Sequence, residues 1–176
     1  MWRICLTLLC TLPSAWCAAE RPVRSLLEAR QEGMIVQQWD NSCAAAALAT
    51  ILTYYKGMTV SEEQVARGML RRTDPLRVRS RGGFSFLDMK RHVGQLGFDS
   101  DGYSGMALED LAVKTPMIVP LNVRGYNHFV VVRHVGDNKV DIGDPSFGNY
   151  AMKRAEFAAK WRGIGFEVGR RREMHE

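Results

Sequence analysis

Cysteine is scarce in this sequence, and long apolar runs are missing from it. Four of the 176 residues are cysteine, three of them within the first 17 positions, which excludes a small disulfide-stapled scaffold. No apolar run reaches the roughly 18–20 residues that span a bilayer, so a polytopic membrane protein is excluded as well. Internal repeats and low-complexity segments are also absent. The length, with 46% hydrophobic and 24% charged residues, is typical of one globular domain.

The charge balance is mildly basic. The 24 Lys and Arg residues against 19 Asp and Glu give a net charge of +5, which suits an anionic partner but is too small to identify one. Arginines concentrate at residues 71–81 and 170–172, without the interleaved aromatic residues typical of nucleic-acid binding. We therefore expect residues 71–81 to form a solvated loop or to attract an acidic peptide, and we predict no nucleic-acid partner.

The first 19 residues have the pattern of an export signal. Arg3 supplies a positive charge, residues 4–12 form a short apolar stretch, and small residues precede a cleavage site after Ala19. A membrane anchor is the alternative, for which the stretch is short. We expect a signal peptide at 1–19 and a single domain at 20–176, exported to the periplasm, with membrane association left open.

Helical patterns precede strand patterns along the chain. Residues 43–55 are rich in alanine and apolar nearly all round, which predicts a central, buried helix. Further helices are expected at 61–70, 86–96, 108–113 and 154–161. Strands are expected at 34–38, 98–103, 117–123, 128–133, 139–142 and 165–168. Mostly helices first and sheet afterwards indicates an α+β fold, with the buried helix packed on a C-terminal antiparallel sheet.

Cys43 lies at the first turn of the predicted buried helix, where the helix dipole favours a thiolate over a thiol. Loss of the leader leaves it as the one cysteine, without a disulfide partner. A thiolate nucleophile needs an imidazole base and a group that orients the imidazole. His128 begins an apolar strand, and Asp144 follows one hairpin later, so its carboxylate is within reach of the His128 ring.

The sequence contains three other histidines that could serve as the base. His134 lies on the same strand face as His128 but at the far end, away from Asp144, and is the alternative. His92 is expected on a helix surface, and His175 lies in the charged tail, where solvation is the simplest interpretation.

Gln37 precedes Cys43 by six residues, and its amide is placed to donate to an oxyanion beside the Cys43 N–H. Gln38 is the alternative donor. Metal-ligand pairs are missing near Cys43 and His128, so we predict no metal and no cofactor. A Gly-x-x-x-x-Gly-Lys-Ser/Thr segment is also missing, so ATP binding is not expected.

Three ordered segments resemble the sequence boxes of the C39 peptidases, papain-like enzymes that remove double-glycine leaders in bacteriocin transporters. They are residues 36–49 around Cys43, 127–132 and 143–145. Further segments resemble the stand-alone, exported branch found with functional-amyloid (Fap-type) secretion systems, namely 82–90, 148–150 and 154–161. The resemblance spans about residues 30–168.

The resemblance implies a papain-like cysteine peptidase fold and a role for each candidate residue. Cys43 would be the nucleophile, His128 the general base, Asp144 its orienting partner and Gln37 the oxyanion donor. The implied substrate is a peptide or secreted protein, cleaved through a thioester during maturation or export of a secreted polypeptide. Secretion-system components are the implied partners.

Ala44 departs from the family, which usually has glycine directly after the cysteine. Its extra methyl group is expected to crowd the substrate backbone beside the nucleophile. The alternative function is therefore a catalytically impaired, C39-like peptide-binding module of a secretion system. Acyl transfer to an acceptor other than water would use the same residues as hydrolysis.

Overall fold

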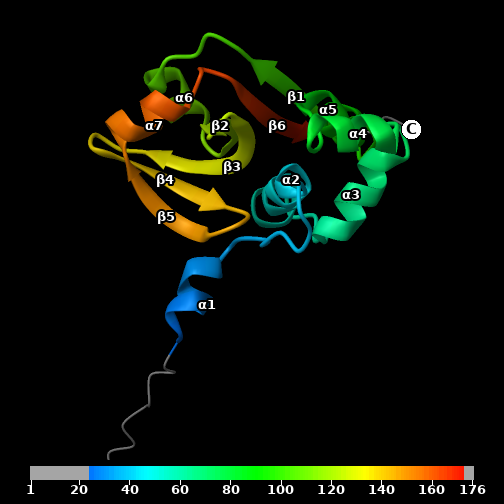
Figure 1. Cartoon of the computed structure of the whole chain (residues 1–176), viewed down its shortest axis with the longest axis horizontal. Helices are drawn as coiled ribbons and strands as arrows, with labels where there is room; N and C mark the ends of the chain where they lie inside the picture. Colours follow the sequence, from blue (N-terminus) through cyan, green and yellow to red (C-terminus); the bar gives the residue numbers. More distant parts are fainter. Residues whose placement is uncertain (1–23, 173–176) are drawn as a thin grey trace, which may run out of the picture.

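A six-stranded antiparallel sheet forms the centre of the molecule, with helices on both of its faces (Figure 1). The computed structural model describes residues 24–172. In sheet order the strands are β1 (Phe98–Tyr103), β6 (Gly165–Arg171), β2 (Met117–Val123), β3 (Tyr126–Val135), β4 (Lys139–Asp144) and β5 (Gly148–Lys153). Strands β2 to β5 follow one another along the chain and pair in that order, as the expected antiparallel sheet requires.

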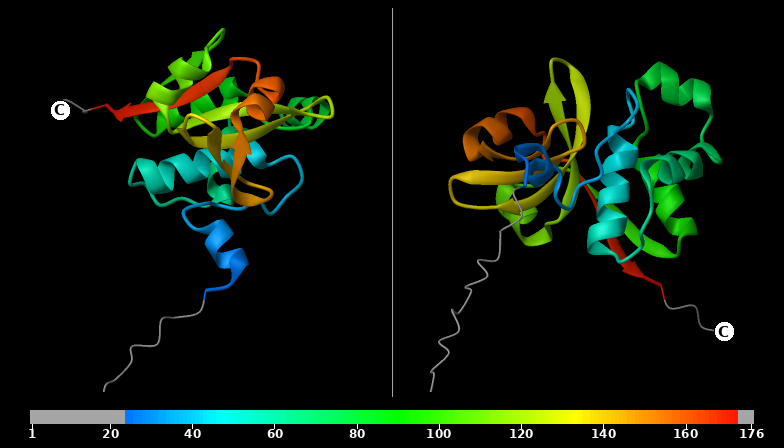
Figure 2. Two further views of the ribbon diagram at one scale, coloured as in Figure 1. Left: turned by 90° about the vertical axis from the view of Figure 1, so that its left-hand side faces the viewer. Right: turned by 90° about the horizontal axis from the view of Figure 1, so that it is seen from below.

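The helices divide between the two faces of the sheet (Figure 2). One side carries α2 (Cys43–Tyr55), α3 (Glu62–Leu70), α4 (Pro75–Arg81) and α5 (Phe86–Gln95). The other carries α6 (Leu108–Lys114) and α7 (Arg154–Lys160). The short helix α1 (Leu26–Gln31) lies apart from both groups, beside β5.

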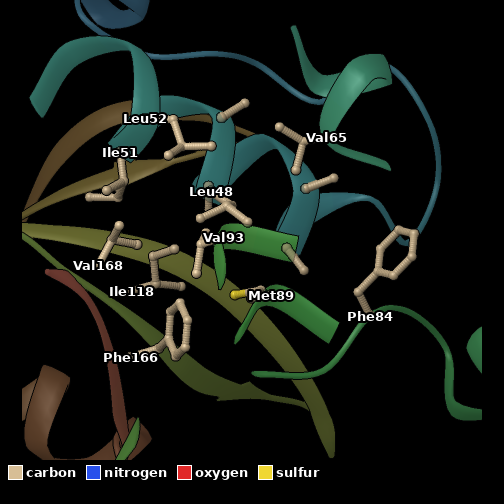
Figure 3. Packing of buried hydrophobic residues seen from close by; sticks show 14 of the residues in the cluster. Leu48, Ile51, Leu52, Val65, Phe84, Met89, Val93, Ile118, Phe166 and Val168 are labelled. Atoms are coloured by element: carbon tan, nitrogen blue, oxygen red, sulfur yellow. The ribbon is translucent and has the colours of Figure 1, made fainter. Parts of the chain in front are cut away.

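The core on the α2 side is built around that helix (Figure 3). All residues from Cys43 to Leu52 are buried, and Leu48 packs in one cluster with Ile118 and Phe166 of the sheet. Side chains alternate between the two faces along β2. Val119, which follows Ile118, therefore faces a second cluster that the sheet forms with α6 and α7. The buried helix on an antiparallel sheet confirms the α+β expectation.

The expected strand at residues 34–38 is absent, because the segment pairs with no strand. Its N–H groups are bonded elsewhere. Ile35 donates to the Thr50 hydroxyl (3.0 Å), Gln37 to the Pro145 carbonyl (2.8 Å) and Gln38 to the Glu62 carboxylate (2.9 Å). A helix hydroxyl, a turn carbonyl and a carboxylate thus take the place of a neighbouring strand.

The expectation of a loop at residues 71–81 is also wrong, because α4 occupies most of it. The Asp74 carboxylate accepts from the Leu76 N–H (2.9 Å) at the N-terminus, and Pro75 lies in the first turn. Gly82, with φ of 80°, ends the helix in the left-handed conformation that glycine adopts without strain. The segment thus contains helix start signals, Asp74 and Pro75, and a helix stop signal, Gly82, which the sequence prediction overlooked among the arginines.

Smaller corrections concern strands and one histidine. The strand β5 was not predicted, and β3 begins at Tyr126 rather than at His128. His92 is buried rather than on the surface, because its ring packs directly against Gly68 of α3, where a side chain would collide with it. The expected signal peptide and His175 lie outside the described residues.

Asp88 holds the loop between α4 and α5 in place. Its buried carboxylate accepts from the Thr73 hydroxyl (2.6 Å), the Arg81 guanidinium (2.6 Å) and the Ser85 N–H (2.8 Å). Burial raises the pKa of Asp88, but the hydrogen bonds from Thr73 and Ser85 and the charge of Arg81 outweigh it, so the pKa is lowered.

Replacing Asp88 by asparagine is expected to lower the free energy of unfolding by about 2 kcal/mol at neutral pH, because bonds to a buried charge are lost. A lowered pKa means that the carboxylate stabilises the fold above the unfolded-state pKa of about 4. That stabilisation is lost as pH falls through the lower folded-state pKa. Urea unfolding at pH 7 and pH 3 measures both effects. The difference between wild type and variant should shrink at pH 3, and an equal difference at both values would contradict this account.

Candidate active site

Cys43 is the first residue of α2, and only 3% of its surface is exposed. Ser42 is the N-cap residue, and its carbonyl accepts the N–H groups of Ala45 (2.8 Å) and Ala46 (3.0 Å). The thiol therefore lies at the positive end of a buried helix, near N–H groups without an intrahelical partner. Helix start and thiol coincide, as the sequence predicts.

His128 and Asp144 lie side by side on the sheet. The β3–β4 pairing sets Val131 opposite Gly143, which brings the start of β3 beside the end of β4. His128 Nε2 lies 2.7 Å from Asp144 Oδ1, and the carboxylate is 2% exposed. Since Asp144 engages Nε2, the hydrogen bond between His128 and Cys43 falls to Nδ1.

Two further groups hold the Asp144 carboxylate. Its Oδ1 accepts from the Ser146 N–H (2.8 Å), and its Oδ2 from the Tyr150 hydroxyl (3.3 Å). Burial and the neighbouring charge of Asp144 raise the pKa of Tyr150, which keeps its hydroxyl protonated as a donor. The carboxylate is thus fixed on both oxygens, and its lone pairs fix the ring of His128.

The thiol and the imidazole shift each other's protonation. Burial raises the pKa of Cys43, but hydrogen bonds from His128 and the Phe129 N–H, with the charge of His128, outweigh it and lower the pKa. Burial lowers the pKa of His128, but its bonds to Asp144 and Cys43 and their charges raise it to about 9. The lowered pKa of the thiol and the raised pKa of the imidazole both favour a thiolate beside an imidazolium.

Gln37 lies on the wall of the same cavity as Cys43 and His128. This cavity measures about 370 Å³ and also includes Asn41 and Ser146 among its lining residues. The Gln37 amide nitrogen donates to the Trp39 carbonyl (3.1 Å), and one N–H remains for the cavity. The structure thus brings together all four predicted site residues, Cys43, His128, Asp144 and Gln37, in one place.

A second cavity of about 350 Å³ also includes Cys43 in its lining, together with the loop between α4 and α5 and Phe129. Tyr126 borders both cavities. Its hydroxyl donates to the Gly82 carbonyl (2.9 Å) across the cleft and lies 3.3 Å from Asn41 Oδ1. Burial, then the charge and hydrogen bond of Cys43, raise the pKa of Tyr126 to about 12. The phenol therefore lies beside the thiol, where both cavities meet Cys43.

The alternatives considered from the sequence lie elsewhere. His134 is exposed near the far end of β3, opposite Asp141. Gln38 is tied to Glu62 through its backbone and does not line the cavity that holds Gln37.

The crowding expected from Ala44 is not found. Its methyl group is 1% exposed and packs in the core cluster of α2, while the thiol of Cys43 faces the cavities. A helix turns about 100° per residue, so adjacent side chains face different surroundings.

Three functional contacts escaped sequence reasoning, those of Tyr126, Ser146 and Tyr150. Tyr150 belongs to the family-like segment 148–150, but it lies on β5, a strand that the sequence did not predict. Ser146 follows Asp144-Pro145, a turn signal that places its N–H on the carboxylate but says nothing of its hydroxyl. Tyr126 directly precedes the family-like segment 127–132 that contains His128, and no spacing pattern in the sequence points to a role for it.

Within residues 24–172, no group of three or more His, Cys, Asp or Glu side chains is arranged to hold a metal ion. None of the helices in that span has the length and apolarity that a bilayer crossing requires.

The charged pair predicts an unusual pH dependence for alkylation of Cys43 by iodoacetamide. Because the pKa of the thiol is lowered, the rate should reach its plateau at a lower pH than for an isolated thiol, which titrates at about 8.5. His128→Ala should remove the plateau and move the midpoint upward, since the hydrogen bond and the charge of His128 are lost while burial still opposes ionisation of the thiol. The matched control is His134→Ala, which removes an exposed histidine of the same strand. An identical profile in wild type and His128→Ala would show that the pair does not form.

Comparison with known proteins supports the sequence resemblance. The model of the Peptidase C39 family matches residues 31–173. The chain is 43% identical over 148 residues to the probable functional amyloid protease FapD of Pseudomonas fluorescens and to that of Pseudomonas aeruginosa. These matches cover 84% of this chain and 65% of each relative, so the chain spans just under two thirds of the length of the curated relatives it matches.

Solved structures agree in fold. A double glycine motif protease from an AMS/PCAT transporter, crystallised with the leader peptide, is 28% identical with a TM-score of 0.63, covering 77% of this chain and 89% of its own. The peptidase domain of Streptococcus ComA is 22% identical with a TM-score of 0.64, covering 78% and 98%, and shares the fold. The expected peptidase fold is confirmed, and the extent of the family match shows that this chain belongs to the peptidase C39 family.

Proposed function

We propose that this chain is a cysteine peptidase that hydrolyses a peptide bond in a peptide or secreted protein through a thioester. The observation that carries the proposal is the contact of His128 with both Cys43 and Asp144, at a thiol that lines two cavities. A buried thiol with a lowered pKa, an oriented imidazole and a nearby amide donor are what acyl transfer requires.

The reaction follows from the protonation states. The Cys43 thiolate attacks the scissile carbonyl, and the N–H groups of Gln37 and Cys43 bind the oxyanion that forms. His128 gives its proton to the leaving amine as the C–N bond breaks, which leaves a thioester on Cys43. His128 then takes a proton from water, which attacks the thioester. The acid is released, and the thiolate and imidazolium are restored.

The relatives indicate the class of substrate. One solved structure of a double glycine motif protease holds a leader peptide, and the FapD proteins are described as functional amyloid proteases. Both support a polypeptide substrate that is processed during maturation or export. Components of a secretion system are the corresponding partners.

The impaired peptide-binding module is the weaker proposal. It was suggested by Ala44, whose methyl group packs in the core rather than in the cleft. The nucleophile, its base and the orienting carboxylate are all present and in contact. Hydrolysis therefore explains the site better than binding alone.

We also propose that the protein is exported and acts in the periplasm. The support is the charged, apolar and small-residue pattern of residues 1–19. An oxidising compartment suits a chain whose mature part has one cysteine, because no second thiol is available to form an intramolecular disulfide with Cys43.

Cleavage is tested with a mixture of synthetic peptides that contains every pair of residues at two central positions. We expect wild type to cleave a subset, Cys43→Ala to cleave none while keeping its unfolding midpoint, and Asp144→Asn to turn over about 10²–10⁴-fold more slowly.

Turnover should fall as pH rises through about 9, where His128 loses the proton for the leaving amine. Mass spectrometry distinguishes a free carboxylate, the product of hydrolysis, from an adduct formed by acyl transfer. Full cleavage by Cys43→Ala would overturn the assignment.

Export is tested by expressing the full chain in a Gram-negative host and sequencing the N-terminus of the periplasmic protein. We expect a mature chain that begins at Glu20. The matched variant Leu8→Arg interrupts the apolar stretch and should keep the uncleaved chain in the cytoplasm. Uncleaved protein that co-sediments with membranes would instead indicate an anchor.

A further inference from the structure

Ser146 connects the two halves of the candidate active site. Its N–H donates to Asp144 Oδ1 (2.8 Å), and its hydroxyl donates to Gln37 Oε1 (2.9 Å). The carbonyl of Pro145 also accepts the Gln37 N–H (2.8 Å). The turn that carries the orienting carboxylate therefore forms hydrogen bonds to both the main chain and the side chain of Gln37.

These contacts determine which end of the Gln37 amide faces which neighbour. The Trp39 carbonyl is an acceptor only, so the amide nitrogen must face it, at 3.1 Å. The amide oxygen then faces the Ser146 hydroxyl. The nitrogen carries two hydrogens, and the one that Trp39 does not take is left for the cavity shared with Cys43. A flipped amide would set two carbonyl oxygens against each other.

The orientation of this amide matters for the chemistry. An N–H aimed at the developing oxyanion stabilises it, whereas an amide oxygen in the same place repels it. The last torsion of a glutamine side chain is broad, so the torsion itself does not hold the amide in one orientation. The Trp39 carbonyl restrains the amide at its nitrogen, and the Ser146 hydroxyl adds the restraint at its oxygen.

We propose that Ser146 is a positioning residue of the reaction, which acts by holding the Gln37 amide with an N–H directed at the oxyanion. The proposal rests on the proposed peptidase function. Ser146 acts through Gln37, so its effect should vanish when Gln37 no longer has an amide. One turn, Asp144 to Ser146, then orients both the base and the oxyanion donor.

The test uses the p-nitrophenyl ester of N-acetylglycine as a probe. Attack by Cys43 passes through an oxyanion, forms the thioester and releases nitrophenolate, which is measured directly. Gln37→Ala should slow acylation about 10²–10³-fold, the usual loss for one oxyanion donor. Ser146→Ala, which misaligns the donor without removing it, should slow acylation about tenfold. The double variant should be no slower than Gln37→Ala alone, because the two residues act as a unit.

Three controls separate positioning from a structural role. Ser146→Thr keeps the hydroxyl and should restore the rate, and Ser104→Ala removes an exposed serine between β1 and α6 and should have no effect. Iodoacetamide alkylation has no oxyanion intermediate, so its pH profile in Ser146→Ala should match wild type. A changed profile would mean that the substitution disturbs the Cys43–His128 pair, and the proposal would fail.

The remaining outcomes are distinct. If wild type and Ser146→Ala are acylated at equal rates, or the two single losses multiply in the double variant, the positioning role is wrong and the peptidase proposal stands. If iodoacetamide alkylates wild type but the ester does not acylate it, the peptidase proposal fails. The positioning role then fails with it, because Gln37 has no oxyanion to bind.

Discussion

The packing of α2 against β3 is the contact on which the candidate active site depends. The helix presents a run of small side chains, Ala45 to Ala47 and Ala49, none of which is exposed. Methyl groups let the helix approach the sheet closely, and Cys43, the first residue of the helix, contacts His128 and Phe129 near the start of β3. A reactive thiol and an imidazole from distant parts of the sequence meet there because two apolar surfaces fit together.

The polar groups at this contact are mutually dependent. Cys43 and Asp144 are almost fully buried, and His128 lies between them. Charges in a low-dielectric environment interact strongly, and a buried charge without its partner is costly. The thiolate, the imidazolium and the carboxylate therefore form a set in which each member stabilises the charged state of the next.

The sequence predicted the parts of this arrangement that depend on local rules. Asp144 was placed beside His128 because two strands joined by a short turn return the chain to its start. The sequence predicts Cys43 at a helix start because Asp40, Asn41 and Ser42 are residue types that favour helix N-termini, although the Ser42 hydroxyl donates to the Trp39 carbonyl rather than capping the helix. The family resemblance then linked Cys43 to the pair of His128 and Asp144. The comparisons confirm the resemblance to the family. The roles assigned to Cys43, His128, Asp144 and Gln37, and the signal peptide at 1–19, remain predictions.

The parts that the sequence did not predict depend on tertiary partners. Residues 34–38 are bonded to α2, α3 and a turn rather than to a strand, and no local pattern shows where such donors will bond. The side chain of Ala44 was judged by its position in the sequence rather than by the helical rotation that carries it into the core. Ser146 and Tyr126 are single polar residues whose hydroxyl partners, Gln37 and Gly82, come from distant segments. By contrast, α4 was predictable from its capping residues, but the many arginines led to the prediction of a solvated loop.

The meander from β2 to β5 has a consequence for the order in which the molecule assembles. Each of its pairings joins neighbours in the chain, so the piece that bears His128 and Asp144 closes only short loops. The docking of α2 onto β3 closes a far longer one and therefore costs more chain entropy. We infer that the thiol meets its base only when the two halves of the chain have come together. An unfinished chain then carries a cysteine that lacks its contact with His128, and the assembled candidate site becomes a late product of folding.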